Sequence, residues 1–244
     1  MKKFIFLVLL GVSLYADEVY ATFVSKGIKE ASLRISSSGI VDMIKVDVGS
    51  KVKKGDLLLK IQNNTQIENV KIQQAQSDAN EQTYIFQKNQ FERYEQSKAV
   101  VDKNTYEQIY SSFKSAENNY KMSLASLQLQ KEILNNTYLK APFDGVIAER
   151  MIEVGDGVSE NGTDLFKLIS NDIKLIIEFD SKYIDKVKVG DKYTFSIDGS
   201  EKKRSVTITK VYPSIDPTNR KLKAEALVKD MVSGVFGDGY ITTK

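Results

Sequence analysis

The sequence predicts an α+β protein of several modules in an elongated arrangement. A glycine-punctuated segment occurs twice, and a long stretch without Pro or Gly separates the two copies. Short segments of alternating or β-branched residues follow the second copy. These three observations predict two strand-rich halves that pack on each other, a long antiparallel α-helical coiled-coil hairpin between them, and a C-terminal module of strands.

The N-terminus has the pattern of a secretory signal peptide over residues 1–16. Two lysines precede the apolar run Phe4–Val12, and Ala16 stands before an acidic pair. A basic start, an apolar centre and a small residue at the end predict cleavage after Ala16. An uncleaved inner-membrane anchor is the alternative, although the run is shorter than the ~20 residues that a membrane span needs. Residues 17–35 are then expected to supply an N-terminal strand region.

The composition excludes several kinds of site. Two of the 35 Lys and Arg residues lie in the signal region, so the remaining chain carries 33 basic residues against 32 Asp and Glu. Such balanced charge argues against nucleic acid as the main partner. The absence of His and Cys rules out a Ser-His-Asp triad, a Cys-His dyad, disulfides, a lipid-anchored cysteine and zinc held by His or Cys. The acidic residues are spread through the chain and no pair stands out as catalytic, so we expect no enzyme, no cofactor and no metal site.

The two copies of the repeated segment are expected to form two strand-rich halves, residues 36–64 and 137–170. A strand, a glycine turn and a second strand cannot bury an apolar face alone, so the halves should pack on each other. Four early pairs are separated by 106 residues: Gly39/Gly145, Val48/Val154, Gly49/Gly155 and Val52/Val158. One extra residue in the second copy then aligns four later pairs: Gly55/Gly162, Leu58/Leu165, Lys60/Lys167 and Ile61/Leu168. Four of these glycines are expected at turns that need a positive φ: Gly49, Gly55, Gly155 and Gly162.

Residues 65–136 are predicted to form the helical hairpin. The stretch contains neither Pro nor Gly and is longer than an ordinary globular helix. A repeat of seven residues in each arm is the seam pattern of a coiled coil. The seam residues are Val70, Ser77, Tyr84 and Phe91 in the first arm, and Tyr106, Phe113, Tyr120, Leu127 and Leu134 in the second.

Antiparallel arms should bring together residues whose numbers have a constant sum. Four seam pairs sum to 197: Phe91/Tyr106, Tyr84/Phe113, Ser77/Tyr120 and Val70/Leu127. This register places the tip near Lys98 and Ala99, within residues 97–103. Each arm of about 33 residues would be roughly 50 Å long.

Residues 171–244 are predicted to form the strand-rich module. A short helix over Tyr183–Val187 and a loop around Pro213 and Pro217 would interrupt the strands. Strands are expected over Leu175–Phe179, Tyr193–Ile197, Ser205–Val211 and Lys221–Val228.

This arrangement resembles the periplasmic adaptor proteins, also called membrane fusion proteins, of tripartite efflux and secretion systems. The half-motifs, the link Leu139–Val146 and the downstream strands carry the resemblance over about residues 30–244. It implies a lipoyl-like β-sandwich split by the hairpin and followed by a β-barrel. Longer family members continue into a membrane-proximal domain, which we expect to be largely absent here. In lipoyl and biotinyl carriers, a modified Lys lies on the tight turn that joins the two half-motifs. In this chain the hairpin is inserted at that junction, after Ile61, so no prosthetic group is expected.

The resemblance also implies two contact regions. In the family, the hairpin tip meets an outer-membrane channel through an Arg, a Leu four residues later and a Ser seven further. Here Arg93 matches the Arg, Ser97 stands at the Leu position and Asp102 aligns with the Ser, with Lys98 at the tip between them. On the barrel, the basic cluster Lys202, Lys203 and Arg204 is the candidate contact for the transporter, with a solvated turn as its alternative.

The function implied is that of a non-enzymatic adaptor in the periplasm, associated with the inner membrane. It would link an inner-membrane transporter, most like the resistance-nodulation-division (RND) type, to an outer-membrane channel for export of drugs or other small molecules. Copies would form a homo-oligomeric ring, a trimer or hexamer, with flexible junctions near Asn64 and Pro142. The alternatives are an ATP-driven (ABC-type) exporter or type I secretion system, and a free periplasmic protein-binding module.

Overall fold

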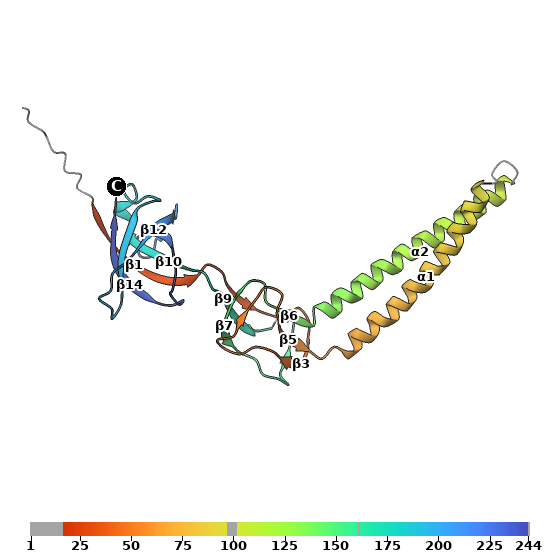
Figure 1. Cartoon of the computed structure of the whole chain (residues 1–244), viewed down its shortest axis with the longest axis horizontal. Coiled ribbons are helices and arrows are strands. Elements are labelled where there is room, and N and C mark those ends of the chain that lie inside the picture. The colour runs from red at the N-terminus through yellow and green to blue at the C-terminus, as the bar shows by residue number, and fades with distance from the viewer. Residues whose placement is uncertain (1–16, 97–101, 161, 244) are drawn as a thin grey trace, which may run out of the picture. The chain divides into compact units, whose positions relative to one another are not determined.

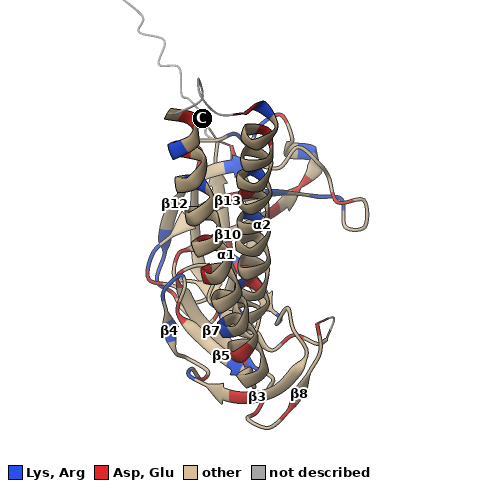
Figure 2. Cartoon of the chain, turned by 90° about the vertical axis from the view of Figure 1, so that its right-hand side faces the viewer, with Lys and Arg blue, Asp and Glu red and all other residues tan. Residues whose placement is uncertain are grey.

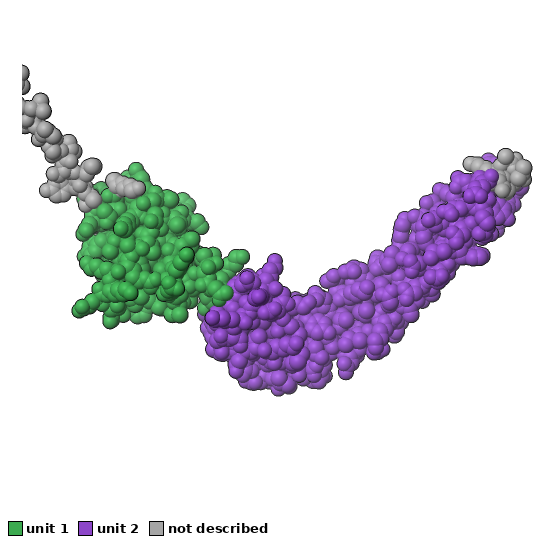
Figure 3. Space-filling view, viewed as in Figure 1, with its two compact units in different colours: residues 1–30, 169–244 green, residues 31–168 purple. Residues whose placement is uncertain are grey.

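The computed structural model describes residues 17–96, 102–160 and 162–243. The chain forms two compact units: one combines residues 1–30 with 169–244, and the other is residues 31–168 (Figure 3). Among the described residues, no helix combines the length and the apolar character needed to cross a membrane. The signal region that the sequence predicts lies outside the described residues.

The first unit is a closed, antiparallel six-stranded barrel in the order β1-β10-β13-β12-β11-β14. Alternate residues of each strand face inward, which is the period-two pattern that places apolar side chains in the core. The strands are β1 (Glu18–Gly27), β10 (Ile173–Asp180), β11 (Lys192–Ile197), β12 (Arg204–Val211), β13 (Lys221–Val228) and β14 (Phe236–Thr242). The short helix predicted over Tyr183–Val187 begins earlier, as a 3₁₀ turn at Ser181–Tyr183 that the Asp180 carboxylate caps by accepting from the Lys182 amide. One helical turn follows, in which the Val187 amide donates to the Tyr183 carbonyl over 3.1 Å.

Aromatic side chains fill the barrel. The rings of Phe23 and Phe195 pack edge to face with centroids 4.7 Å apart, and the buried Tyr193 hydroxyl donates to the Ala21 carbonyl over 3.0 Å. Gly239 lies against β11, where a Cβ would come within 2.2 Å of the Thr194 carbonyl oxygen. Glycine is therefore required at this point of β14 for the barrel to close around its aromatic core.

The second unit contains the sandwich, which has two four-stranded sheets in the orders β2-β9-β7-β4 and β6-β5-β3-β8 (Figure 1). Its strands are β2 (Glu30–Leu33), β3 (Gly39–Ile44), β4 (Lys51–Val52), β5 (Leu57–Ile61), β6 (Tyr138–Lys140), β7 (Gly145–Arg150), β8 (Gly157–Val158) and β9 (Phe166–Ser170). The apolar members of the repeat, such as Leu58 and Leu165, form a single buried core.

The repeat of 106 residues is visible in the hydrogen bonds. The Gly49 amide donates to the Ile147 carbonyl over 2.8 Å, and the Gly155 amide donates to the Val41 carbonyl over 2.9 Å. Short strand β4 of the first half pairs with β7, and β8 of the second half pairs with β3. Each half therefore completes a sheet of the other, as expected for halves that cannot fold alone.

Three of the four turn glycines have the positive φ that the sequence predicts. Their φ values are +85° at Gly49, +92° at Gly55 and +96° at Gly155, a conformation that other residues rarely adopt. At Gly162, a Cβ would lie 2.9 Å from the Ser159 carbonyl oxygen, so a close approach of the chain requires glycine there.

The predicted hairpin is formed by α1 (Asn64–Gln96) and α2 (Lys103–Asn135), which run side by side (Figure 1). The rings interleave rather than facing one another singly, which corrects the one-to-one register. Tyr84 lies 6.0 Å from Phe113, as predicted, but also 5.7 Å from Tyr120. Phe91 stacks on Phe113 at 5.1 Å and lies 5.8 Å from Tyr106. The seam is therefore a continuous ladder of rings.

At the base of the hairpin, the segment that leaves the sandwich is hydrogen-bonded to the segment that re-enters it. The Ile61 amide donates to the Thr137 carbonyl over 3.1 Å. The buried Asn63 amide group donates to the Thr137 hydroxyl over 2.9 Å, and this hydroxyl donates to the Leu134 carbonyl over 2.6 Å. Movement at the junction proposed near Asn64 would have to break these bonds.

Candidate functional site

The described part of the hairpin end carries Arg93 and Asp102. Arg93 is exposed in the last turn of α1, where a positive charge interacts favourably with the negative end of the helix dipole. Ser97 and Lys98 lie outside the described residues. The structure thus shows only the two flanks of the predicted channel-binding tip.

Asp102 caps the N-terminus of α2. Its carboxylate accepts from the Thr105 amide over 3.0 Å and from the Thr105 hydroxyl over 3.2 Å, so it is the N-cap of α2. An N-cap acceptor satisfies a backbone amide that has no partner within the helix. Sequence alignment to the family motif did not reveal this role, although an Asp three residues before a Thr at the start of a helical stretch is a capping signal.

The basic cluster on the barrel divides into three different environments. Arg204 begins β12, and its guanidinium donates to the carbonyls of Asp230 and Lys229 over 3.3 and 2.5 Å. Lys202 is exposed in the turn, where its amide donates to the Ser200 hydroxyl. Lys203 lines a hollow on the outer wall of the barrel. The three residues of the predicted cluster therefore have different partners.

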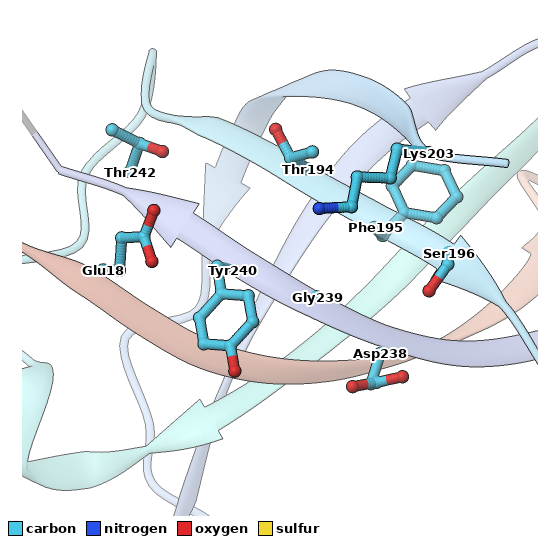
Figure 4. A pocket seen from close by; sticks show the side chains of 9 residues that line it. All are labelled: Glu18, Thr194, Phe195, Ser196, Lys203, Asp238, Gly239, Tyr240 and Thr242. Carbon is cyan, nitrogen blue, oxygen red and sulfur yellow. The ribbon is translucent and has the colours of Figure 1, made fainter. Parts of the chain in front are cut away.

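The hollow at Lys203 is an open pocket of about 310 Å³ over strands β1, β11 and β14 (Figure 4). Two carboxylates and one ammonium group border it, so its lining is mixed in charge. Its lining residues are Glu18, Thr194, Phe195, Ser196, Lys203, Asp238, Gly239, Tyr240 and Thr242.

Exposed aromatic side chains stand beside this pocket, and the sequence analysis missed them. Tyr20 and Tyr240 are paired across β1 and β14, with ring centroids 5.7 Å apart in an edge-to-face contact. Phe236 is also exposed on β14. Partial desolvation of its hydroxyl and the neighbouring Asp238 carboxylate raise the pKa of Tyr20 above its ordinary value. An aromatic cluster on an outer barrel wall is a common anchor for a protein partner.

A charged network on another part of the barrel is structural in character. The nearly buried Glu225 carboxylate accepts from Lys174 over 2.6 Å and from the Tyr212 hydroxyl over 2.6 Å, and Lys210 lies 3.3 Å away. Burial opposes ionisation, but these partners outweigh it and hold the pKa of Glu225 at about 2. Lys174 lies on β10 and Lys210 on β12, and Tyr212 directly follows β12, so the network ties β10 and β12 to Glu225 on β13.

The described residues hold no group of three or more His, Cys, Asp or Glu side chains arranged to bind a metal ion. The geometry of both candidate regions is that of contact surfaces: an exposed helix end and an aromatic barrel wall.

Comparison with known proteins gives one family. Residues 29–169, more than half of the chain, match the family described as CzcB-like, barrel-sandwich hybrid domain. An uncharacterized protein of Haemophilus influenzae is 25% identical over 213 residues, which cover 84% of this chain and 52% of that protein. The cobalt-zinc-cadmium resistance protein CzcB of Cupriavidus metallidurans is 27% identical over 202 residues, 77% of this chain and 36% of that protein. The chain spans about half or less of the length of these relatives.

Solved structures have the same fold. MacA from Actinobacillus actinomycetemcomitans superposes with a TM-score of 0.78 at 21% identity, covering 94% of this chain and 79% of that chain. A membrane fusion protein of Streptococcus pneumoniae gives a TM-score of 0.72 at 17% identity, covering 93% of this chain and 99% of that one. These likenesses confirm the predicted sandwich, hairpin and barrel.

Proposed function

The chain belongs to the family of CzcB-like barrel-sandwich hybrid proteins, and on this basis we propose that it is the periplasmic adaptor of a tripartite efflux pump. Membrane fusion proteins of this kind are adaptors of efflux systems and not enzymes. The proposed adaptor links an inner-membrane transporter to an outer-membrane channel. The observation that carries the proposal is the hairpin inserted in the sandwich, because a rod roughly 50 Å long can reach a partner far from the sandwich.

The outer-membrane channel is the proposed partner of the hairpin end. Arg93 supplies an exposed, permanently charged donor that suits a carboxylate or carbonyl acceptor on the channel. Asp102 contributes by fixing the start of α2, and Ser97 and Lys98 complete the proposed contact.

The transporter is the proposed partner of the barrel wall around Tyr20, Tyr240 and Lys203. This surface combines exposed aromatic rings with charged groups at its border, which is the composition of anchoring residues in protein interfaces. Lys202 and Arg204, the sequence neighbours of Lys203, belong to the same proposed contact. An RND-type transporter is favoured, with an ABC-type exporter or type I secretion system as the alternative.

The cargo is proposed to be drugs or other small molecules. The similarity to a cobalt-zinc-cadmium resistance protein adds divalent metal ions as a second candidate. Cells that lack this chain should become sensitive to whichever class it exports, and growth in graded concentrations of drugs and of cobalt, zinc and cadmium salts distinguishes the two.

Site-specific crosslinking in living cells tests the assignment of both partners. A photoreactive amino acid at Arg93 should capture an outer-membrane protein, and one at Tyr240 should capture an inner-membrane transporter. Matched controls are Gln82, exposed on the side of α1 away from its end, and Leu227, exposed on β13 away from the aromatic wall. Capture of soluble proteins alone would refute the adaptor role in favour of a free periplasmic binding module. The class of transporter captured decides between the RND and ABC types.

A further inference from the structure

The hollow over β1, β11 and β14 is lined by outward side chains in three adjacent rows. Strand pairing places Tyr240 beside Tyr20 in the middle row. Asp238 lies in the row on one side, and Glu18 is paired with Thr242 in the row on the other side. Successive rows are about 7 Å apart along β14. The ring of Tyr240 therefore has a carboxylate residue on each side of it, as Figure 4 shows.

The aromatic side chains distinguish this hollow from the rest of the barrel surface. Charge alone does not, because Lys and Arg are interspersed with Asp and Glu along the whole chain (Figure 2). Among the described residues of the barrel, the aromatic side chains that are about half or more exposed are Tyr20, Phe236 and Tyr240, all on β1 and β14. Tyr240 lines the hollow, packs edge to face with Tyr20 and is still 48% exposed. Its ring is thus held in place and partly accessible to a ligand.

The charges that act on the Tyr20 hydroxyl are those of acids. Partial desolvation, the Asp238 charge and a hydrogen bond to that carboxylate raise the pKa of Tyr20, and the Asp198 charge adds to the effect. The positive groups close to the hollow are Lys203 in its lining and Lys192 on β11. A positively charged ligand at the two rings would therefore meet attraction from the acids and repulsion from Lys203.

These features suit a small organic cation. The face of an aromatic ring attracts a cation through the ring quadrupole, and the carboxylates in the two adjacent rows supply counter-charges. An anion would be repelled by the same carboxylates. The volume of about 310 Å³ is at the lower end of the range for ligand pockets, which favours a small ligand. A guanidinium group would gain most from a bidentate pair with one carboxylate, but Asp238 already accepts from Tyr20.

We propose that the hollow on the outer wall of the barrel is a binding site for a small organic cation with an alkylated ammonium group. The ammonium group lies over the Tyr240 ring, with Asp238 and Glu18 as its counter-charges. The Lys203 ammonium limits the affinity, because it repels the ligand. The site is a property of the barrel alone, so the inference goes beyond the adaptor role and does not depend on it.

Choline is the probe for this site, because it carries a trimethylammonium group. Its neutral control is the uncharged analogue in which carbon replaces the nitrogen. In the purified chain at low salt, followed by the amide chemical shifts in NMR spectra, choline should cause saturable shifts in β1, β11 and β14 around Tyr240. We expect a dissociation constant of about 1–10 mM, and binding of the neutral analogue at least about tenfold weaker.

Three outcomes of this titration would overturn the proposal. Shifts that do not saturate would mean that choline has no site, and equal shifts with the neutral analogue would mean that the positive charge is not recognised. Guanidinium chloride at the same concentration is the third arm. Tighter binding of guanidinium than of choline would assign the hollow to an arginine side chain of a protein partner instead.

Substitutions of opposite charge then test the counter-charges. Asp238→Asn should weaken choline binding about two- to fivefold, and Lys203→Gln should strengthen it by a similar factor, since exposed charges contribute modestly. Asp185→Asn is the matched control, because Asp185 is exposed in the loop after β10 and does not line the hollow. A change in the same direction for Asp238→Asn and Lys203→Gln, or no change in either, would contradict the proposed electrostatics.

The ring is tested by two substitutions at one position. Tyr240→Phe keeps the aromatic face and should bind choline within about twofold of the wild-type chain, whereas Tyr240→Leu keeps an apolar side chain and should lose about tenfold or more. Equal binding by the two variants would refute a cation–π site. Unchanged amide shifts outside β1, β11 and β14 establish that each variant keeps the barrel fold. All of these results are independent of whether a transporter or channel is captured in cells.

Discussion

Replacing Phe113 with Ala is expected to destabilise the hairpin selectively. Phe113 is half-buried in the ladder of rings, where it stacks on Phe91 at 5.1 Å and on Tyr84 at 6.0 Å, and the Lys114 ammonium lies 5.0 Å from its ring centre. Its removal takes away both ring contacts and the middle of the ladder. The effect should therefore exceed that of removing an exposed phenylalanine of the same helical pair.

The contacts set the size of the effect. Each stacked aromatic pair contributes about 0.5–1.5 kcal/mol beyond its buried area. A fully buried Phe→Ala change costs roughly 3–5 kcal/mol. Because Phe113 is half-buried and has two stacking partners, we expect a loss of about 2–3 kcal/mol in the free energy of unfolding of the hairpin.

Urea unfolding followed by circular dichroism at a helix wavelength measures this loss, because α1 and α2 hold nearly all of the helix among the described residues. Phe86→Ala is the matched control, since Phe86 is exposed and lies outside the seam. The measurement belongs at low protein concentration, where association cannot add stability. If Phe113→Ala and Phe86→Ala shift the midpoint equally, the interleaved seam is not what holds the helices together.

Three further changes test other parts of the structure. Because its neighbours lower the pKa of Glu225 to about 2, the stabilisation from its ionised form is complete above the ordinary carboxyl pKa and is lost as the pH falls towards 2. Glu225→Gln should therefore cost about 3 kcal/mol at neutral pH and little near pH 2, and an equal cost at both would contradict the network. Asp102→Ala should cost about 1 kcal/mol of hairpin stability by removing the N-cap, whereas Asp102→Asn should retain most of it; equal losses in urea unfolding would argue against capping. Tyr84→Asp places a charge in the ladder and should collapse the hairpin, and unchanged helix content and export would show that the seam is assigned wrongly.

Local sequence patterns predicted the elements well where turn chemistry and periodicity agree. Strand β13 has the predicted ends, Lys221 and Val228, because alternation is uninterrupted between two turns. Strand β14 was not predicted, since Gly237 and Gly239 look like turn residues in sequence. Tertiary packing requires these glycines, because the backbone of β11 occupies the space that a side chain at either position would need.

The candidate sites were less predictable than the fold. The heptad pattern identified the residues of the seam but not the half-step by which Tyr84 lies between Phe113 and Tyr120, because axial offset depends on how the rings pack. The aromatic wall at Tyr20 and Tyr240 joins two ends of the chain that become neighbours only when the barrel closes. Aromatic residues at outward positions of these two strands were the available signal.

The bonded base of the hairpin has a consequence for how such a protein can change its reach. Since the Ile61 amide already meets the Thr137 carbonyl, the sandwich is closed at this point whatever length of chain is inserted between these residues. Adding one heptad to each arm would extend the rod by about 10 Å while the seam continues in register. Insertions of other sizes would rotate the ladder of rings out of contact. Rods of different length are thus accessible in discrete steps, without any redesign of the fold that anchors the rod.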